Sequence, residues 1–301
     1  MKRSKYLIAL VAVAAIIVAV NVFLYMQSDK LVRVRVATTT SLYATGLLDY
    51  LAEQFYRQYP NVNVRIDFIA VGSGEALKRA AKGDACMVFV HAPSLEREYV
   101  EKGVLEQHRI IAYNFFVVVG PQDDPARVRG SGNAVEVFMK IYAAGEQGKA
   151  MFVSRGDYSG THVREMSIWS LAGLDPRGKP WYRESGAGMA QTLIIANELK
   201  AYTLSDIGTY LKLKRDGRLP NLEILYSNDT ELINIYSIYI VKSCTGEERR
   251  YAELFADFIY NNQELIGQYG IDKYGQPLFY PAKSKESYLY KVWLKLSRGI
   301  G

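Results

Sequence analysis

Short apolar segments alternate with amphipathic segments along the chain from Val32 onward. Alternating or continuous apolar runs of four to eleven residues predict strands, and apolar residues at helical spacing predict the helices between them. Because the links are short, strand and helix alternate as they do around a parallel α/β sheet. The predicted strands are Val32–Ala37, Val62–Val71, Cys86–Val90, Ile110–Gly120, Met151–Ser154, Leu222–Tyr226 and Ile235–Val241. The clearest helices are Glu75–Lys82, Ala134–Ala144, Thr161–Leu171 and Met189–Leu199.

Two of these apolar segments, Ile110–Gly120 and Ile235–Val241, bracket a central block. We expect them to be paired crossovers between two lobes. Residues 31–115 and 234–301 then form lobe I, and residues 116–233 form lobe II. Open α/β sheets bind ligands at the carboxyl ends of their strands, so a cleft between the lobes is the expected site.

Residues 1–30 form a separate N-terminal segment. Tyr6–Met26 is uncharged, and its 21 residues would rise about 31 Å as a helix, enough to cross a bilayer. Lys2, Arg3 and Lys5 precede it, which predicts a cytoplasmic N-terminus and an extracellular remainder. A cleaved signal peptide is the alternative. The absence of a small-residue cleavage pair after Val20 favours an uncleaved transmembrane helix that holds the protein at the cell membrane.

Composition excludes several classes of protein. With 49% apolar and 23% charged residues, the 301-residue chain is typical of globular proteins. Half of the net charge of +6 lies in the first 30 residues, so the remainder lacks the dense basic face that nucleic acid requires. Cys86 and Cys244 are too few for a structural zinc site. They are either a disulfide or two buried thiols.

Three loops share one arrangement, in which a strand is followed by small or hydroxyl residues and then by the start of a helix. They are Thr38–Ser41, Gly72–Gly74 and Arg155–Thr161. Helix N-termini offer unpaired N–H groups, and hydroxyls add donors, so the three loops together predict an anion site. Arg155 is the one formal charge that we place in it, because a guanidinium can grip an oxyanion with two parallel bonds. A salt bridge from Arg155 to Asp157 is the alternative.

The sequence offers little support for catalysis. His91, His108 and His162 do not lie at metal-binding spacing, and neither a nucleophile elbow nor a phosphate-loop lysine is present. We therefore expect a binding protein and not an enzyme, with no cofactor and no metal cation.

Seven segments follow one another in an order that resembles a known family: TTTSLYATGLLDYL, FIAVGSGEALKRAAKGDA, VHAP, IIAYNFFVVVGPQDDPA, FVSRGDYSGTHVRE, WYRESGAGMAQTLIIANELKAYTLSDIGTYL and IYSIYIV. The chain is similar over residues 33–245 to the tungstate-binding components of tungstate ABC transporters, the TupA type of extracellular solute-binding protein. That resemblance implies a two-lobed, type II periplasmic-binding-protein fold. It also implies a monomer that captures tungstate and delivers it to a membrane permease with its ATPase.

The family's binding motifs fall on eight residues of this chain, which are the expected ligand-binding residues: Thr39, Thr40, Ser41, Ser73, Arg155, Ser159, Gly160 and Thr161. The chain departs from the family at Asp206-Ile207, where Asp-Arg is frequent, and at Ala85–Met87, where an acid is lost. Molybdate, sulfate and phosphate are alternative ligands, and Asp157 is the residue that could accept a phosphate proton. A membrane-anchored anion sensor is the alternative of another class.

Overall fold

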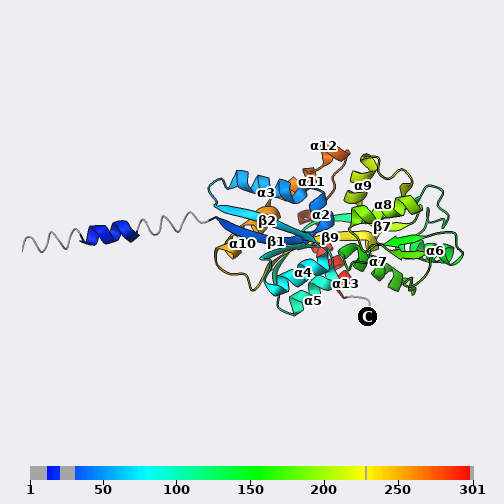
Figure 1. Cartoon of the computed structure of the whole chain (residues 1–301), viewed down its shortest axis with the longest axis horizontal. Coiled ribbons are helices and arrows are strands. Elements are labelled where there is room, and N and C mark those ends of the chain that lie inside the picture. The colour runs from blue at the N-terminus through cyan, green and yellow to red at the C-terminus, as the bar shows by residue number, and fades with distance from the viewer. Residues whose placement is uncertain (1–11, 21–30, 228, 299–301) are drawn as a thin grey trace, which may run out of the picture.

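The computed structural model of the protein describes residues 12–20, 31–227 and 229–298 (Figure 1). Residues 12–20 are helical, and the rest of the predicted membrane segment at 6–26 lies outside the described residues. Within the described ranges, no helix has both the length and the apolar character needed to cross a membrane.

Eight of the strands in the described part of the chain form a mixed sheet, and β5 and β6 form a separate parallel pair, so the prediction of a parallel sheet was only partly right. Strand β1 pairs in parallel with β2 and β3, as expected, but the long strands β4 and β9 run antiparallel to their neighbours. The order is β10-β4-β9-β3-β1-β2, and β7 and β8 pair with the far end of β4. The strands are β1 Val32–Thr39, β2 Val64–Val71, β3 Met87–Val90, β4 Leu105–Pro121, β5 Phe152–Ser154, β6 Tyr182–Glu184, β7 Thr203–Asp206, β8 Leu222–Tyr226, β9 Ile233–Val241 and β10 Tyr280–Pro281.

Strand β4 belongs to two regions of the molecule. Its first part pairs with β9 from Leu105↔Val241 to Phe115↔Ile233. Its last residues, from Phe116 onward, pair with β7 and β8 instead. The antiparallel direction follows from this role, because β4 carries the chain out of the first region and β9 brings it back.

Helices cover both faces of the sheet in each region. In Figure 1, α3 lies on one side of β1 and β2 with α4 and α5 on the other, and α8 and α9 lie opposite α6 and α7. The helices are α2 Thr40–Ala44, α3 Leu47–Gln58, α4 Ser73–Lys82, α5 Pro93–Glu101, α6 Ala134–Glu146, α7 Gly160–Leu171, α8 Met189–Leu199, α9 Ile207–Arg215, α10 Gly246–Asn261, α11 Glu264–Gln268, α12 Ile271–Tyr274 and α13 Glu286–Ser297, with 3-10 turns at η1 Thr230–Leu232 and η2 Lys283–Lys285.

Separate apolar cores lie in the two regions. The first packs Phe55 and Phe255 against β1, β3 and β9. In the second region, Phe138 and Trp169 of α6 and α7 fill one side of the β4–β7–β8 strands, and α8 and α9 fill the other. A further cluster seats Trp293 of α13 on the crossing strands. Because every residue of β9 is buried, the crossover lies inside the packed structure.

Cys86 and Cys244, for which the sequence left two interpretations open, form a disulfide with a Cα–Cα distance of 5.2 Å. It joins the residue before β3 to the turn after β9, across 158 residues of chain. Nearby, the Arg35 guanidinium donates to both carboxylate oxygens of Glu248, which ties β1 to α10. These links hold the N-terminal and C-terminal parts of the first region together.

Candidate ligand-binding site

The β1–α2 connection presents a row of hydroxyls. Thr39 is the N-cap of α2, and its Oγ1 accepts a hydrogen bond from Leu42 N at 3.3 Å. Its Oγ1 also lies 3.4 Å from Ser41 Oγ. The neighbouring Oγ1 atoms of Thr38 and Thr40 are buried without a hydrogen-bond partner among the described residues. Hydroxyls in that state are costly, since buried polar groups are nearly always paired.

The β2–α4 connection supplies a second donor. Gly72 is the extended N-cap of α4, and Ser73 is the first helical residue. Ser73 has no exposed surface, and within the described structure its Oγ has no partner. The start of α4 therefore offers a hydroxyl together with the unpaired N–H groups of a helix N-terminus.

The β5–α7 connection carries Arg155. Its side chain is 3% exposed, and Nη2 donates to Asp157 Oδ2, so the predicted alternative of a salt bridge is present. The pairing is incomplete, because Arg155 Nε is buried without a partner in the described part of the chain. The other Asp157 oxygen, Oδ1, accepts from Ser159 N at 3.1 Å. Asp157 thus holds the arginine and the loop in one arrangement.

Ser159, Gly160 and Thr161 begin α7. Ser159 is the N-cap, and its Oγ accepts from His162 N at 3.4 Å. Thr161 is 1% exposed, and its Oγ1 lacks any partner that the structure describes. Gly160 lies so close to His91 that a Cβ there would be 2.8 Å from His91 Cε1. Only glycine fits between the helix start and that ring.

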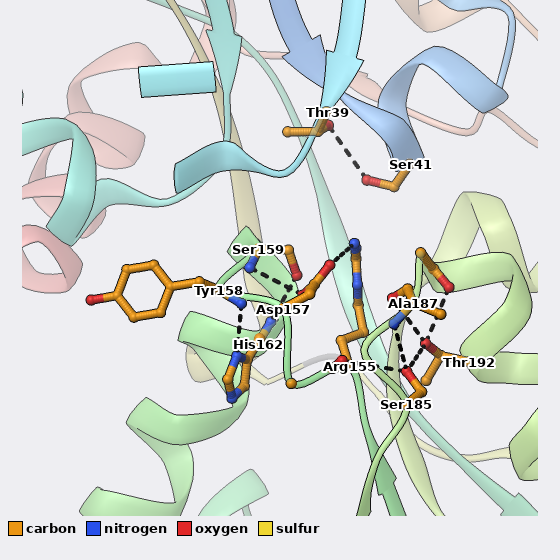
Figure 2. A network of polar contacts seen from close by, with 12 residues as sticks. Thr39, Ser41, Arg155, Asp157, Tyr158, Ser159, His162, Ser185, Ala187 and Thr192 are labelled. Carbon is orange, nitrogen blue, oxygen red and sulfur yellow. Dashed lines mark hydrogen bonds and ion pairs between the residues drawn. The ribbon is translucent and has the colours of Figure 1, made fainter. Parts of the chain in front are cut away.

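Loops from the two regions meet at this point. A Cβ at Gly72 would lie 3.7 Å from Ser159 Cα, and one at Gly188 would lie 3.8 Å from Thr40 Oγ1. Figure 2 shows Thr39 and Ser41 on one side of a gap, with Arg155, Asp157 and Ser159 on the other. The structure therefore brings the three predicted loops together.

A fourth loop, after β6, was not among the predicted ligand-binding segments. Gly186 N and Ser185 Oγ both donate to the Arg155 carbonyl, at 2.9 and 3.3 Å. Ser185 Oγ also lies 2.8 Å from Thr192 Oγ1 of α8 (Figure 2). This loop fixes the backbone of Arg155. Its run of Gly186, Ala187 and Gly188 before a helix was the signal in the sequence that could have identified it.

Glu165 supports the same loop from behind. Its Oε2 accepts from Ser154 Oγ at 2.7 Å, and Ser154 Oγ in turn accepts from Gly156 N at 3.2 Å. Its Oε1 accepts from Tyr182 OH and Trp169 Nε1. Complete burial raises the pKa of Glu165 to about 7. The bonds attach the Arg155 loop to α7 through a side chain that titrates near neutrality.

His91 is a second residue that the sequence analysis did not assign to the site. Its Nδ1 lies 2.9 Å from Asn234 Oδ1, and its ring stacks on Tyr236. Burial lowers the pKa of His91 to about 4, so the ring is neutral at physiological pH. Its Nε2 is buried and has no partner within the described ranges. Asn234 also donates to Asn114 Oδ1, so His91 belongs to a polar network between β4 and β9.

The polar groups of the site suit binding better than catalysis. His91 Nδ1 is hydrogen-bonded to Asn234 Oδ1, and His162 Nδ1 accepts a hydrogen bond from the Tyr158 amide. Neither of these bonds activates a hydroxyl of the site as a nucleophile. Within the three loops, five side chains have a buried polar atom without a partner among the described residues, and they are four hydroxyls and one cation: Thr38, Thr40, Ser73, Thr161 and Arg155. Such a set matches a compact anion that presents acceptor oxygens in several directions.

Comparison with known proteins identifies the family. Residues 27–263 match the PBP superfamily domain. The tungstate-binding protein TupA of Peptoclostridium acidaminophilum is 37% identical over 83% of this chain and 85% of its own. The structure of the tungstate ABC transporter from Geobacter sulfurreducens matches with a TM-score of 0.68 and a sequence identity of 38%. That match covers 79% of this chain and 98% of the other chain. The structure of the tungstate-binding protein TupA from Desulfovibrio alaskensis G20 matches with a TM-score of 0.69 and a sequence identity of 36%. That match covers 83% of this chain and 98% of the other chain. The chain belongs to the periplasmic-binding-protein superfamily and, within it, to the family of TupA-type tungstate-binding proteins.

Proposed function

We propose that the protein binds tungstate between its two regions and delivers it to the permease of an ABC transporter. The observation that carries this proposal is a set of buried donors that lack a partner among the described residues, on loops that meet at one place: Thr38, Thr40, Ser73, Arg155 and Thr161. Tungstate is a tetrahedral dianion, and its four oxygens would pair with these donors. The proposed ligand-binding residues remain Thr39, Thr40, Ser41, Ser73, Arg155, Ser159, Gly160 and Thr161, with Thr38 added.

The energetics favour an anion that is completely enclosed. A dianion loses several kcal/mol of hydration when it is buried, and oriented neutral donors with one arginine offset that loss. The donors are already removed from water in the described structure. The free energy of desolvating them is therefore part of the stability of the ligand-free protein and does not reduce the binding free energy. Asp157 places a negative charge nearby, but its two oxygens already accept bonds from Arg155 and Ser159 N. That engagement makes Asp157 a poor acceptor for a phosphate proton.

The test is calorimetric titration and thermal unfolding of the full chain with tungstate, molybdate, sulfate and phosphate. Tungstate at a thousand times its dissociation constant is expected to stabilise the protein by about 4 kcal/mol. Molybdate is expected to bind as well, since it has the same shape and charge. Sulfate is smaller and phosphate carries a proton, so both are expected to bind far more weakly. Absence of a shift with all four anions would contradict the proposal.

Binding and release would occur by movement of the two lobes about β4 and β9, with the boundaries at residues 115/116 and 233/234. Small-angle scattering of the full chain tests this: tungstate is expected to reduce the radius of gyration. An unchanged radius with saturating tungstate would show that binding needs no closure.

The proposed role in transport sets the location and partners. The binding domain would face the outside of the cell as a monomer, with the permease and its ATPase as partners and with neither nucleic acid nor catalysis involved. We also propose that residues 6–26 anchor the chain in the membrane. Fractionation of cells that express the full chain tests the anchor: the parent is expected in the membrane pellet, and a chain that lacks residues 6–26 is not. A parent that is shortened and released would identify a signal peptide instead.

A further inference from the structure

A further cavity lies along α7 and reaches Gly160, which also belongs to the proposed oxyanion site that the three loops form. It has a volume of about 230 Å³. The walls come from α7, from the start of α5 and from Leu296 of α13. His91 and Gly160 line it as well, so this cavity and the oxyanion site share one partition.

Arg164 is the charged group of this cavity, and its situation is unusual. It is 6% exposed, and its one hydrogen bond within the described structure is a long one, 3.5 Å from Nη2 to the Ile233 carbonyl. Among the described carboxylates none forms an ion pair with it, although Glu231 is near enough to act on its charge. Burial lowers the pKa of Arg164 to about 10, which leaves it charged at neutral pH. A buried guanidinium that has one long carbonyl bond and no ion pair within the described structure is unfavourable.

The remaining lining divides into polar and apolar parts. Ser94, Ser167, Ser170 and His91 border the cavity, and His91 Nε2 is a buried atom that lacks a partner in the described chain. Apolar walls come from other side chains of the same elements: Pro93, Val163, Met166 and Leu296. A ligand for this lining carries an anionic head and an apolar body.

We propose that this cavity is a second ligand site, which takes a small organic carboxylate with its head on Arg164 and its body against Val163 and Met166. A carboxylate accepts two parallel bonds from a guanidinium and would neutralise the buried charge. The volume of the cavity, about 230 Å³, suits such a ligand, since a cavity of roughly 150 Å³ is enough to hold benzene. An inorganic oxyanion would satisfy Arg164 but leave the apolar wall without a contact. This site shares Gly160 with the oxyanion site but uses Arg164 in place of Arg155, and it does not depend on the function proposed above.

The test uses benzoate as the probe on the full chain saturated with tungstate, with saturation-transfer NMR and calorimetric titration. Saturable binding is expected. Arg164→Met is expected to weaken it by about tenfold or more, because the charge-assisted bonds are lost. Ser167→Phe keeps the charge but fills the cavity, and is expected to abolish binding. Arg177→Gln is the matched control, since Arg177 is an exposed arginine paired with Asp175, and it is expected to bind benzoate like the parent.

Tungstate affinity separates this proposal from the proposed function. Arg164→Met is expected to bind tungstate like the parent and to unfold at a temperature no lower than the parent's, because it removes an unpaired buried charge. Three results would overturn the second site: no saturable benzoate binding, equal binding by Arg164→Met and parent, or binding that Arg155→Ala abolishes. If tungstate does not bind at all, the comparison of benzoate on parent and Arg164→Met still decides the second site.

Discussion

Gly74, at the second position of α4, lies directly against Tyr158 of the loop that carries Arg155. A Cβ at Gly74 would be 3.1 Å from Tyr158 Cδ1 and 3.2 Å from the Tyr158 carbonyl oxygen. Tyr158 has a positive φ of 59°, an unfavourable conformation for an aromatic residue, so its backbone has little freedom to move away. The two loops thus approach each other so closely that one more methyl group at Gly74 would push Tyr158 away by a few tenths of an ångström.

We therefore expect Gly74→Val to hold the two lobes apart. Overpacking of this kind costs about 1–3 kcal/mol, which corresponds to a roughly five- to 150-fold loss of tungstate affinity in calorimetric titration. The thermal midpoint without ligand is expected to stay near the parent's, because the open form relieves the contact. Gly132→Val is the control, since a Cβ at Gly132 meets only Glu136 Oε2, at 3.4 Å. Parental affinity in Gly74→Val would show that the contact does not limit closure.

Thr161→Val tests the unpaired hydroxyls. The substitution keeps the shape and removes a buried Oγ1 that lacks a partner among the described residues. The ligand-free protein is expected to gain about 1 kcal/mol of stability, while tungstate affinity falls about tenfold. Denaturant unfolding and calorimetry measure the two effects. Thr209→Val is the control of opposite sign, because Thr209 Oγ1 donates to Asp206 Oδ2 at 2.8 Å and its removal is expected to destabilise the protein.

Arg155→Ala is expected to weaken tungstate binding by about two orders of magnitude, since it removes the one cation of the site. Part of that loss arises because Asp157 is left as an unpaired charge. The double variant Arg155→Ala/Asp157→Asn separates the two effects, and is expected to bind more tightly than the single variant. Equal affinity in both variants would show that Asp157 does not repel the ligand.

Glu165→Gln is expected to change how stability depends on pH. The pKa of Glu165 is raised from 4.5 to about 7, so the folded protein keeps a proton that the unfolded chain has lost. The contribution of Glu165 is therefore fully present below pH 4.5 and is lost as the pH rises through 7, by on the order of 3 kcal/mol. The difference between parent and variant is the measured quantity, because it cancels the opposite effect of the buried histidines. A difference that does not vary with pH would assign the titration to other groups.

The disulfide is expected to stabilise the fold without contributing to ligand affinity. Replacing Cys86 and Cys244 by alanine is expected to cost about 2–5 kcal/mol of unfolding free energy, because the bond closes a loop of 158 residues. Strand β3 separates Cys86 from His91, so tungstate affinity is expected to stay within about threefold of the parent's. Denaturant unfolding and calorimetry test both statements. A large loss of affinity at unchanged stability would contradict them.

Local sequence patterns correctly predicted the helices and strands whose apolar residues recur at the spacing typical of that element. The strand at Val32 alternates apolar and polar residues, the strand at Cys86 is a continuous apolar run, and the helices at Ala134 and Thr161 carry apolar residues at helical spacing. The structure places all four within one to two residues of the predicted ends. Strand β7, at Thr203–Asp206, was not predicted. It is short and three of its four residues are polar, and its burial comes from pairing with β4, which local periodicity does not encode.

The relative direction of neighbouring strands in the sheet could not be predicted from such local patterns. Local alternation distinguishes strands from helices, but Ile110–Gly120 and Ile235–Val241 have the same apolar character whether they run parallel or antiparallel to their neighbours. Their antiparallel pairing depends on where the chain leaves and re-enters the first region. The same limit applies to the site. The three loops could be identified from the sequence by their residue types. Ser185, Glu165 and His91 are separated from Arg155 in the sequence, and they approach its loop only in the fold.

The crossover at β4 and β9 also sets an order of assembly during synthesis. Strand β3 requires β9 as its partner, and Cys86 requires Cys244, but the whole of residues 116–233 leaves the ribosome before either partner exists. The central segment contains its own apolar core, and its strands β7 and β8 pair with the end of β4, which belongs to the same segment. It can therefore fold as an inserted unit while the first region still lacks its middle strand. A truncated chain that ends before Ile233 would thus hold one finished half together with open strand edges on β3 and on β4, which is the form that chaperones must protect.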